Sequence, residues 1–568
     1  TNITGIAGVT ATTLTGTLQT AAQANVTSVG TLTGLTVSAD STINSVTVGK
    51  GANSVTNNTA FGLNALDASV TGDENTAIGK GALTDLTTGS ANTIVGSSCG
   101  DAITTGADNT AMGVSALGTN TTGANNTAIG RAALFANTTA NNNTALGYYA
   151  LQQNTTGANN VAVGANSLDA STTGNKNTAI GRMALSANTT AHDNTAVGGD
   201  ALLVNTTGAS NTAVGSNALD ANTTASNNTA VGYNALGANT TGAENVAIGY
   251  NALDASNANN NVAIGAYAAT ANTTGASNTV IGYSALGSNT TGNYNIAVGQ
   301  DALNSNTTAS NNTSIGFRSL RDNTTGADNT AIGFFALLAN TTGASNTAVG
   351  AYALDACTIG HSNTAVGYLS LSADVDGIRN VAIGFHAGQA QNDADDNVWI
   401  GYQAGLSNTT GGANTGIGKD ALRANTTASN NTAIGVDAMT QNSTGANNTA
   451  LGAEALTANT TGTVNVAVGK DSMQANTTGD NNTAIGKDSL QYNTTADDNT
   501  AVGYQALKVN TTGTRCVAVG TRALDANTDA VNNTAIGCDA MTNCTTGVDN
   551  TAVGREAAQY ITNGYHNV

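Results

Sequence analysis

The seventeen residues Asn228-Thr-Ala-Val-Gly-Tyr-Asn-Ala-Leu-Gly-Ala-Asn-Thr-Thr-Gly-Ala-Glu244 are repeated along almost the whole chain. The glycine at the fifth position of this unit returns every seventeen residues from Gly62 to Gly554, apart from one sixteen-residue step between Gly249 and Gly265. The chain therefore holds thirty copies with one deletion. Such a regular period indicates one supersecondary unit stacked on itself, so the sequence predicts a solenoid.

The positions before the glycine predict a β-strand. Val231, Ile248 and Ile264 stand directly before it, at a position that is apolar in all thirty copies, and the residue two earlier is always Thr, Val or Ile. These two positions share one face, because side chains alternate along a strand, and β-branched residues suit a pleated sheet. We expect Val231, Ile248 and Ile264 to form the core of the coils. Leu236 and Leu253, four residues after the glycine, would join that core from a second short strand.

The position between the two apolar ones faces the other side of the strand. It is Ala230, Ala247 and Ala263 in three successive copies, Ala in twenty-five copies and uncharged in all of them, unlike an ordinary solvent surface. Seventeen residues at ~3.3 Å each make a coil of only about 56 Å of chain, so the roll is thin and buries little apolar area. We therefore expect an all-β, parallel β-solenoid in which this alanine face forms the interface of a homotrimer.

An asparagine stands four residues before the glycine in twenty-nine copies, with Cys516 as the exception. We expect this column at a corner, where Asn tolerates left-handed backbone and its side chain can hydrogen-bond from coil to coil. Thirty coils at ~4.8 Å each predict a straight rod of about 140 Å. The missing residue lies at Ser256-Asn257-Ala258, and we expect that turn to absorb the deletion without bending the rod.

Composition excludes several classes of function. Charged residues make up 9% of the chain and the net charge is −19, which argues against nucleic-acid binding because that requires clustered Lys and Arg. No apolar run approaches the ~18 residues of a membrane-spanning helix, so we expect no membrane insertion. The five cysteines are odd in number and have no CxxC spacing, which argues against disulfide bonds and a zinc site. We expect no cofactor and no metal.

Candidate catalytic residues do not converge. The four histidines would lie far apart along the rod: His192, His361, His386 and His566. Asp420, Asp471 and Asp488 share one column and each follows a lysine, which is typical of a charge-balanced surface rather than of a carboxylate pair. We therefore predict no catalytic site.

An aromatic column follows the glycine. Its tyrosines are Tyr148, Tyr233, Tyr250, Tyr283, Tyr368, Tyr402 and Tyr504, with Phe317, Phe334 and Phe385 between them. Such a stripe can bind glycans by stacking on sugar faces, or it can pack between chains. Trp399 occupies the alanine column, and we expect its ring to be accommodated by Gly388, Gly405 and Gly416.

The first residues differ from the repeat. Thr, Ser, Val and Leu alternate in Thr31–Ser38 and again in Val46–Val48, which predicts short strands. We divide the chain into a β-rich stalk or connector, residues 1–50, and the repeat shaft, residues 51–568.

The run from Ala11 to Val37, Ala-Thr-Thr-Leu-Thr-Gly-Thr-Leu-Gln-Thr-Ala-Ala-Gln-Ala-Asn-Val-Thr-Ser-Val-Gly-Thr-Leu-Thr-Gly-Leu-Thr-Val, resembles a connector of tail-fibre proteins from bacteriophages, marine ones especially. The Asn-Thr-Ala-Ile-Gly arrays are similar to repeats of the same fibres and to the heads of trimeric autotransporter adhesins. Those heads are trimers of left-handed parallel β-rolls, so the resemblance implies that architecture here.

The resemblance implies a non-catalytic phage tail fibre on the virion, which acts as a spacer and an adhesion shaft. Its partners would be two further copies of the chain, flanking fibre or tail proteins, and a host cell-surface glycan. A bacterial surface adhesin is the main alternative; a polysaccharide depolymerase and an ice-binding solenoid are weaker ones. Because the repeat presents nearly one surface thirty times, we expect host specificity to lie outside residues 1–568.

Overall fold

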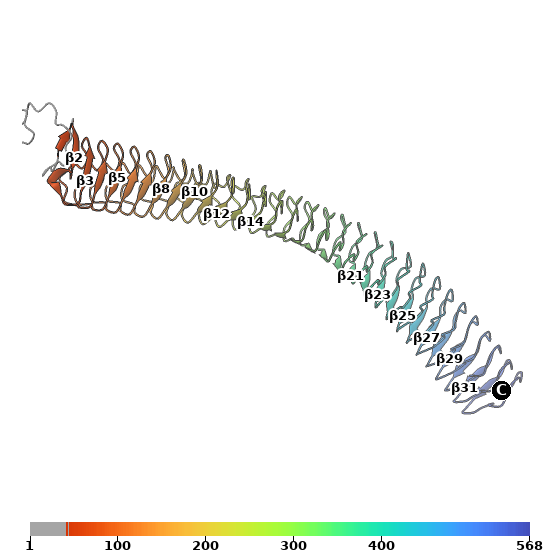
Figure 1. The fold of residues 1–568 in the computed structure, drawn as a ribbon. Coiled ribbons are helices and arrows are strands. Elements are labelled where there is room, and N and C mark those ends of the chain that lie inside the picture. Colours follow the sequence, from red (N-terminus) through yellow and green to blue (C-terminus); the bar gives the residue numbers. More distant parts are fainter. Residues whose placement is uncertain (1–40, 44) are drawn as a thin grey trace, which may run out of the picture.

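The computed structural model describes residues 41–43 and 45–568 of the chain. Thirty parallel strands, β3 to β32, follow one another at one strand per coil and form a single sheet along a rod (Figure 1). One short 3-10 helix precedes the coils, and the remaining residues of each coil are turns, bends and residues without regular secondary structure. The prediction of an all-β, parallel β-solenoid with a seventeen-residue repeat is confirmed.

The elements have the following bounds: β1 Ser41–Ile43, β2 Val46–Gly49, the 3-10 helix η1 Ala52–Ser54, β3 Thr59–Gly62, β4 Thr76–Ile78, β5 Thr93–Val95, β6 Thr110–Met112, β7 Thr127–Ile129, β8 Thr144–Leu146, β9 Val161–Val163, β10 Thr178–Ile180, β11 Thr195–Val197, β12 Thr212–Val214, β13 Thr229–Val231, β14 Val246–Ile248, β15 Val262–Ile264, β16 Thr279–Ile281, β17 Ile296–Val298, β18 Thr313–Ile315, β19 Thr330–Ile332, β20 Thr347–Val349, β21 Thr364–Val366, β22 Val381–Ile383, β23 Val398–Ile400, β24 Thr415–Ile417, β25 Thr432–Ile434, β26 Thr449–Leu451, β27 Val466–Val468, β28 Thr483–Ile485, β29 Thr500–Val502, β30 Val517–Val519, β31 Thr534–Ile536 and β32 Thr551–Val553.

An antiparallel hairpin precedes the first coil. β1 pairs with β2, and β2 pairs antiparallel with β3, which opens the parallel stack. Val46–Val48 is thus part of a strand, as predicted, and that strand belongs to the sheet of the solenoid. The predicted strands at Thr31–Ser38, and the stalk up to residue 40, lie outside the described residues.

Each strand pairs with the next in one register. Ala230 of β13 lies opposite Ala247 of β14, and Ala247 lies opposite Ala263 of β15, although a residue is missing between the last two strands. The deletion is taken up in the turn, where the carbonyl of Ala258 accepts a hydrogen bond from the Asn245 amide at 2.8 Å. The predicted place of the deletion is therefore confirmed.

The assignment of strand faces from the sequence was wrong, because the two faces are exchanged. Ala230, Ala247 and Ala263 are fully buried inside their own coils, so they cannot form a contact between chains. Ile248 on the opposite face is 38% exposed, and Val231 and Ile264 are half-buried, so these residues line the outside of the coil. The other predicted core residues, Leu236 and Leu253, are fully buried as expected.

The width of the coil explains the exchange. An alanine on the strand faces a leucine across the roll, and two large side chains do not fit between the walls. Where the strand position is Ile or Trp, the facing position is glycine: Ile94 faces Gly100, and a Cβ at Gly100 would lie 3.4 Å from methyl carbons of Ile94. The smaller Val280 is accommodated together with Leu286. The alanine column is thus constant because it is the core, and not because it meets another chain.

Trp399 confirms this arrangement on a larger scale. Its ring is fully buried in the alanine column, and a Cβ added at Gly405 or Gly388 would lie 2.3 Å or 2.6 Å from ring atoms. A Cβ at Gly416 would lie 2.8 Å from the same ring. The predicted accommodation of Trp399 by three neighbouring glycines is confirmed.

The segment that carries Leu236 is a series of turns and not the second strand that we expected. Asn234 and Leu236 have left-handed φ angles of 56° and 53°, with Ala235 between them outside that region. Their N–H groups therefore point in opposite directions along the rod: that of Asn234 donates to Ser216 in the preceding coil, and that of Leu236 donates to Ala252 in the next. Coil-to-coil hydrogen bonds thus form without a strand.

Two asparagine ladders satisfy the buried polar groups of the turns. The side-chain amides of Asn228 and Asn239 both donate to the carbonyl of Gly242, at 2.9 Å and 3.0 Å. The side-chain oxygen of Asn228 accepts the backbone N–H of Asn245 one coil on, as predicted. Left-handed φ falls on the residue before Asn228 and not on Asn228 itself. Asn239 also donates to Asn222 of the preceding coil at 3.2 Å, which forms a second, unpredicted ladder.

The repeat glycine allows close approach between coils. Gly232 has a φ of 136°, and a Cβ there would lie 2.5 Å from the carbonyl oxygen of Gly249.

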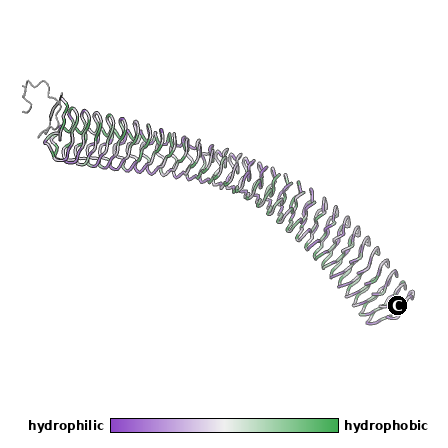
Figure 2. The backbone as a smooth tube through the Cα atoms, viewed as in Figure 1, coloured by the Kyte–Doolittle hydropathy of each residue, from purple (hydrophilic) through white to green (hydrophobic). Residues whose placement is uncertain are grey.

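Figures 1 and 2 show that the rod curves between β14 and β21, so the expectation of a straight rod was wrong. Figure 2 also shows hydrophobic residues recurring coil after coil along the rod.

Candidate functional site

The predicted aromatic stripe lies on the surface. Its seven tyrosines are each between 44% and 53% exposed: Tyr148, Tyr233, Tyr250, Tyr283, Tyr368, Tyr402 and Tyr504. A second aromatic column, one residue further along each coil, was missed because it is populated in only a few copies; it holds Tyr149, Tyr267, Phe335, Tyr352 and His386. In two coils the second column supplies a ring where the first has alanine, at Tyr267 and Tyr352. Its other members lie beside a ring of the first column in the same coil.

The rings make two continuous ladders. The shorter ladder runs over four coils from Tyr233 to Tyr283, with centroids 5.3 to 5.9 Å apart. The longer ladder runs over six coils from Phe317 to Tyr402. Its most nearly parallel pair is Phe385 with Tyr402, whose ring centroids lie 5.4 Å apart and whose planes differ by 4°. Each such pair contributes about 0.5–1.5 kcal/mol beyond its buried area.

Ring orientation limits what the ladder can bind. Where neighbouring rings are stacked, as in Phe385 and Tyr402, each ring covers part of the face of the other. A sugar that binds an aromatic residue needs a free face, so the stacked stretches present little of the surface that such binding uses. The ladder therefore packs coil on coil within one chain. This role differs from both functions predicted for the stripe, glycan binding and packing between chains.

The predicted acidic column forms local ion pairs. Asp420, Asp471 and Asp488 have side chains only 11%, 13% and 6% exposed, and each lies 2.9 to 3.6 Å from the ammonium group of the lysine before it. Each carboxylate is thus neutralised by its neighbour along the chain. Among residues 41–43 and 45–568, no three His, Cys, Asp or Glu side chains are grouped so that they could hold a metal ion.

A buried polar cluster interrupts the second asparagine ladder. Cys357, Asp374 and Gln391 take the place of asparagine in three successive coils, and all three are buried. An oxygen of Asp374 lies 3.3 Å from the side-chain amide nitrogens of both Asn380 and Gln391, and the other accepts the N–H of Gly377 at 3.1 Å.

Burial dominates the electrostatics of this cluster. It raises the pKa of Asp374 from 3.8 to about 7, against the lowering effect of its hydrogen bonds, and it raises the pKa of Cys357 to about 12. Gln391 also accepts the indole N–H of Trp399 at 2.8 Å. The cluster is closed to solvent, so it presents no surface to a substrate.

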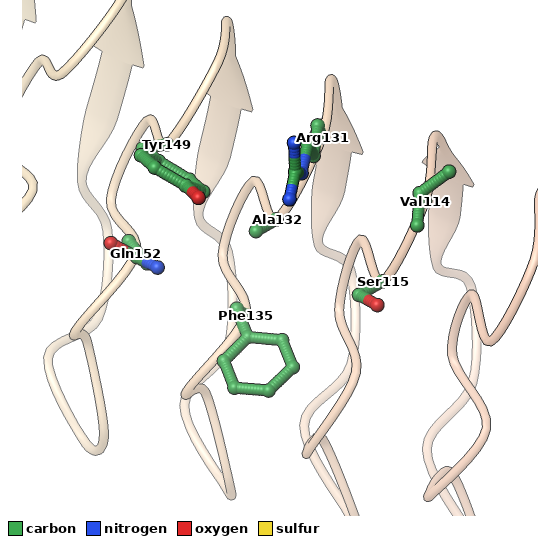
Figure 3. Close-up of a pocket in the computed structure, with 7 residues that line it drawn as sticks. All are labelled: Val114, Ser115, Arg131, Ala132, Phe135, Tyr149 and Gln152. Atoms are coloured by element: carbon green, nitrogen blue, oxygen red, sulfur yellow. The ribbon is translucent and has the colours of Figure 1, made fainter.

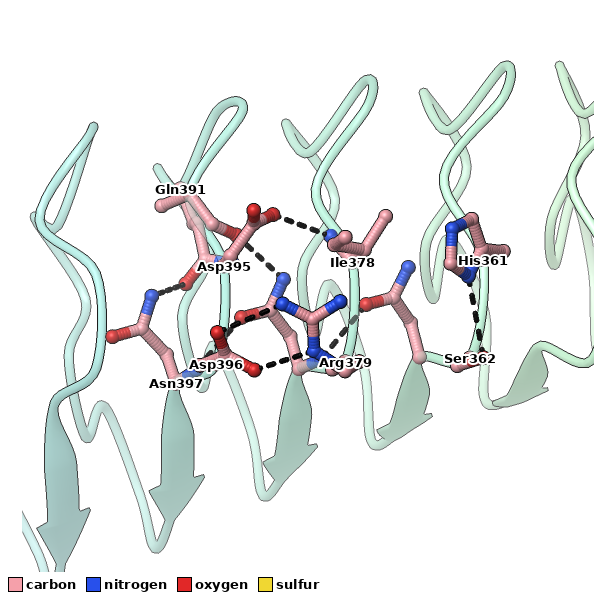
Figure 4. A network of polar contacts seen from close by, with 11 residues as sticks. His361, Ser362, Ile378, Arg379, Gln391, Asp395, Asp396 and Asn397 are labelled. Carbon is pink, nitrogen blue, oxygen red and sulfur yellow. Dashed lines mark hydrogen bonds and ion pairs between the residues drawn. The ribbon is translucent and has the colours of Figure 1, made fainter.

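On the outside of the same coils lies a bidentate ion pair. Arg379 contacts both oxygens of Asp396, at 2.7 and 2.9 Å, and Asp395 accepts the N–H of Ile378 at 2.9 Å (Figure 4). The pair raises the pKa of Arg379 and lowers that of Asp396, chiefly through the hydrogen bonds between them. The ring of His361 lies 3.3 Å from the hydroxyl of the neighbouring Ser362, and its backbone carbonyl accepts the N–H of Arg379 at 3.2 Å.

No known protein family and no curated protein matches the chain. Within residues 41–43 and 45–568, no helix has the length and apolar character needed to cross a membrane.

Proposed function

We propose that this protein is a non-catalytic fibre shaft that associates with two further copies of itself, side by side and in register. Its setting would be a phage tail fibre on the virion, as the sequence resemblance implies, with a bacterial surface adhesin as the alternative. The shaft would hold flanking fibre or tail proteins apart and present a long surface to a host glycan. Its coils would have the left-handed roll of the adhesin heads.

The observation that carries the proposal is an apolar column that one chain leaves exposed. The residue before the repeat glycine is apolar in all thirty copies and faces outward; Ile248, Ile281 and Ile315, for example, are 38–39% exposed. Contiguous exposed apolar surface of this length is rare on soluble monomers and marks an interface.

The periodicity of the column supports a second copy of this chain as its occupant. A surface that repeats once per coil, at ~4.8 Å, is matched along its whole length only by another surface with the same spacing. A parallel copy of this chain has that spacing. Closed association around an axis also avoids the open filaments that non-closing contacts produce. Association of three copies would bury this column at the trimer interface, which is the place first predicted for the alanine column.

The test compares two triple variants of equal charge. Ile248→Lys, Ile281→Lys and Ile315→Lys place three cations on the apolar column, whereas Thr241→Lys, Thr274→Lys and Thr308→Lys place three cations on an exposed turn. Sedimentation equilibrium of the parent chain should give three chain masses. The isoleucine variant should dissociate, and the threonine variant should not.

A folded parent that sediments as a single chain would refute self-association. Circular dichroism and thermal melting must show that the isoleucine variant keeps its strands, because the column lies outside the coil. If both variants remained trimeric, the interface would lie elsewhere on the rod.

A further inference from the structure

We propose that a pocket beside Arg131 binds the ring of a carboxylated sugar. The pocket has a volume of about 200 Å³ and lies across three neighbouring coils (Figure 3). Its lining includes Arg131, Phe135, Tyr149, Gln152 and Ser115. The site is complete within one chain, so it does not depend on the proposed trimer.

The hollow arises from departures from the repeat that coincide. Ala132 is a small residue between Ser115 and Tyr149 in the same column of the coils before and after it. Phe135 leans away from that position onto the preceding coil, where a Cβ at Gly118 would lie 2.7 Å from the ring. The space above Ala132 is therefore left open, with an aromatic ring on two sides, as Figure 3 shows.

Arg131 lacks the carboxylate that its counterpart has. Arg182 occupies the same column three coils on and pairs at 2.8 Å with Asp200, eighteen residues later. Eighteen residues after Arg131 stands Tyr149, and no described carboxylate forms an ion pair with Arg131. Its guanidinium instead lies 6.0 Å from the ring centroid of Tyr148. In a chain of net charge −19, this cation is left for a ligand to neutralise.

The lining defines the ligand. A guanidinium recognises a carboxylate through paired hydrogen bonds. The rings of Phe135 and Tyr149 offer apolar contact to the C–H face of a sugar, while the amide of Gln152 and the hydroxyl of Ser115 offer hydrogen bonds to its hydroxyl groups. A pocket of about 200 Å³ is smaller than a typical site for a drug-sized ligand, so it suits one sugar ring and not an oligosaccharide.

Two kinds of acidic sugar share this chemistry, a uronic acid and a nonulosonic acid. Saturation-transfer NMR on the purified full chain would use D-glucuronic acid and N-acetylneuraminic acid as separate probes, with glucose and acetate as controls. We expect transfer to one acidic sugar at millimolar concentration and at least about tenfold weaker binding of glucose and acetate. The arm that responds identifies the class of sugar.

Arg131→Gln should weaken binding of the acidic sugar by at least about tenfold. The matched control is Arg182→Gln, which removes the same charge from the same column and should leave binding unchanged. Lack of transfer to both acidic sugars, equal binding to Arg131→Gln, or equal binding of acetate would each overturn the proposal. A chain that sediments as a monomer but still binds the sugar would refute the proposed trimer alone.

Discussion

Replacing Asp374 by asparagine should stabilise the rod at neutral pH and above. Asp374 is a fully buried carboxylate at a position that is asparagine in most coils. Asparagine there can donate to the carbonyl of Gly377 and accept from the amide of Gln391, as the ladder residues do elsewhere. The charged carboxylate can only accept, and burial disfavours its charge.

The pKa of Asp374 determines the sign and the size of its effect on the stability of the folded chain. Asp374 has a pKa of about 7 in the folded chain against 3.8 in the unfolded one, so the folded state holds the proton more tightly. Stability is therefore undiminished below about pH 4, falls as pH rises, and is fully reduced above about pH 7. At 1.36 kcal/mol per pH unit, the reduction reaches about 4 kcal/mol, or roughly a thousandfold in local opening.

Hydrogen–deuterium exchange read by mass spectrometry can localise this effect. Near pH 8, peptides around Asp374 should exchange up to roughly a thousandfold more slowly in Asp374→Asn than in the parent, and near pH 4 the two should agree once intrinsic rates are corrected. Asp376→Asn is the control, because Asp376 is exposed two residues away. Equal protection of the parent and Asp374→Asn near pH 8, or a difference that persists near pH 4, would refute the reasoning.

Three further predictions test the assignment of columns. Ala230→Asp should prevent local folding, since it buries an unpaired charge, whereas Val231→Asp should leave the strand content intact and weaken association between chains. Circular dichroism measures the strand content and sedimentation measures the association. An intact Ala230→Asp rod would contradict the assignment of the alanine column to the core. Trp399→Ala should cost about 3–5 kcal/mol, and adding Gly405→Leu should recover part of it, because other coils hold Leu at that left-handed position; thermal melting that shows no recovery would argue against facing columns. Asn239→Ala should cost about 1–3 kcal/mol, measured as loss of exchange protection in its own and adjacent coils, because it leaves the Asn222 oxygen and the Gly242 carbonyl short of a donor.

The strict period made the architecture predictable. Once one glycine recurs every seventeen residues, each coil must pair with the next in one register, so Ala230 is placed opposite Ala247 without reference to any other residue. The turn that absorbs the deletion follows from the same reasoning. Curvature of the rod does not, because it arises from small rotations between coils that no residue pattern encodes directly.

The side of the strand that faces the core was not predictable from residue type alone. Large β-branched residues are usually buried, and that rule placed Val231 inside. The interior here is too narrow for two large side chains, and Leu236 from the turn already occupies it. Sequence did contain the needed signal, which was compensation between columns: Ile94 with Gly100, and Trp399 with Gly405.

The same distinction separates position from orientation in the aromatic stripe. That Tyr402 would be exposed followed from its column, but that its face would lie against Phe385 depended on ring angles, which sequence does not specify. Orientation decides the function: Tyr402 lies parallel to Phe385 in the ladder, whereas Tyr149 is tilted by 38° against Tyr148 and also lines the pocket beside Arg131. Recognition is therefore expected where the repeat is irregular, at Arg131, and rigidity where it is regular, so one column of side chains supplies both properties.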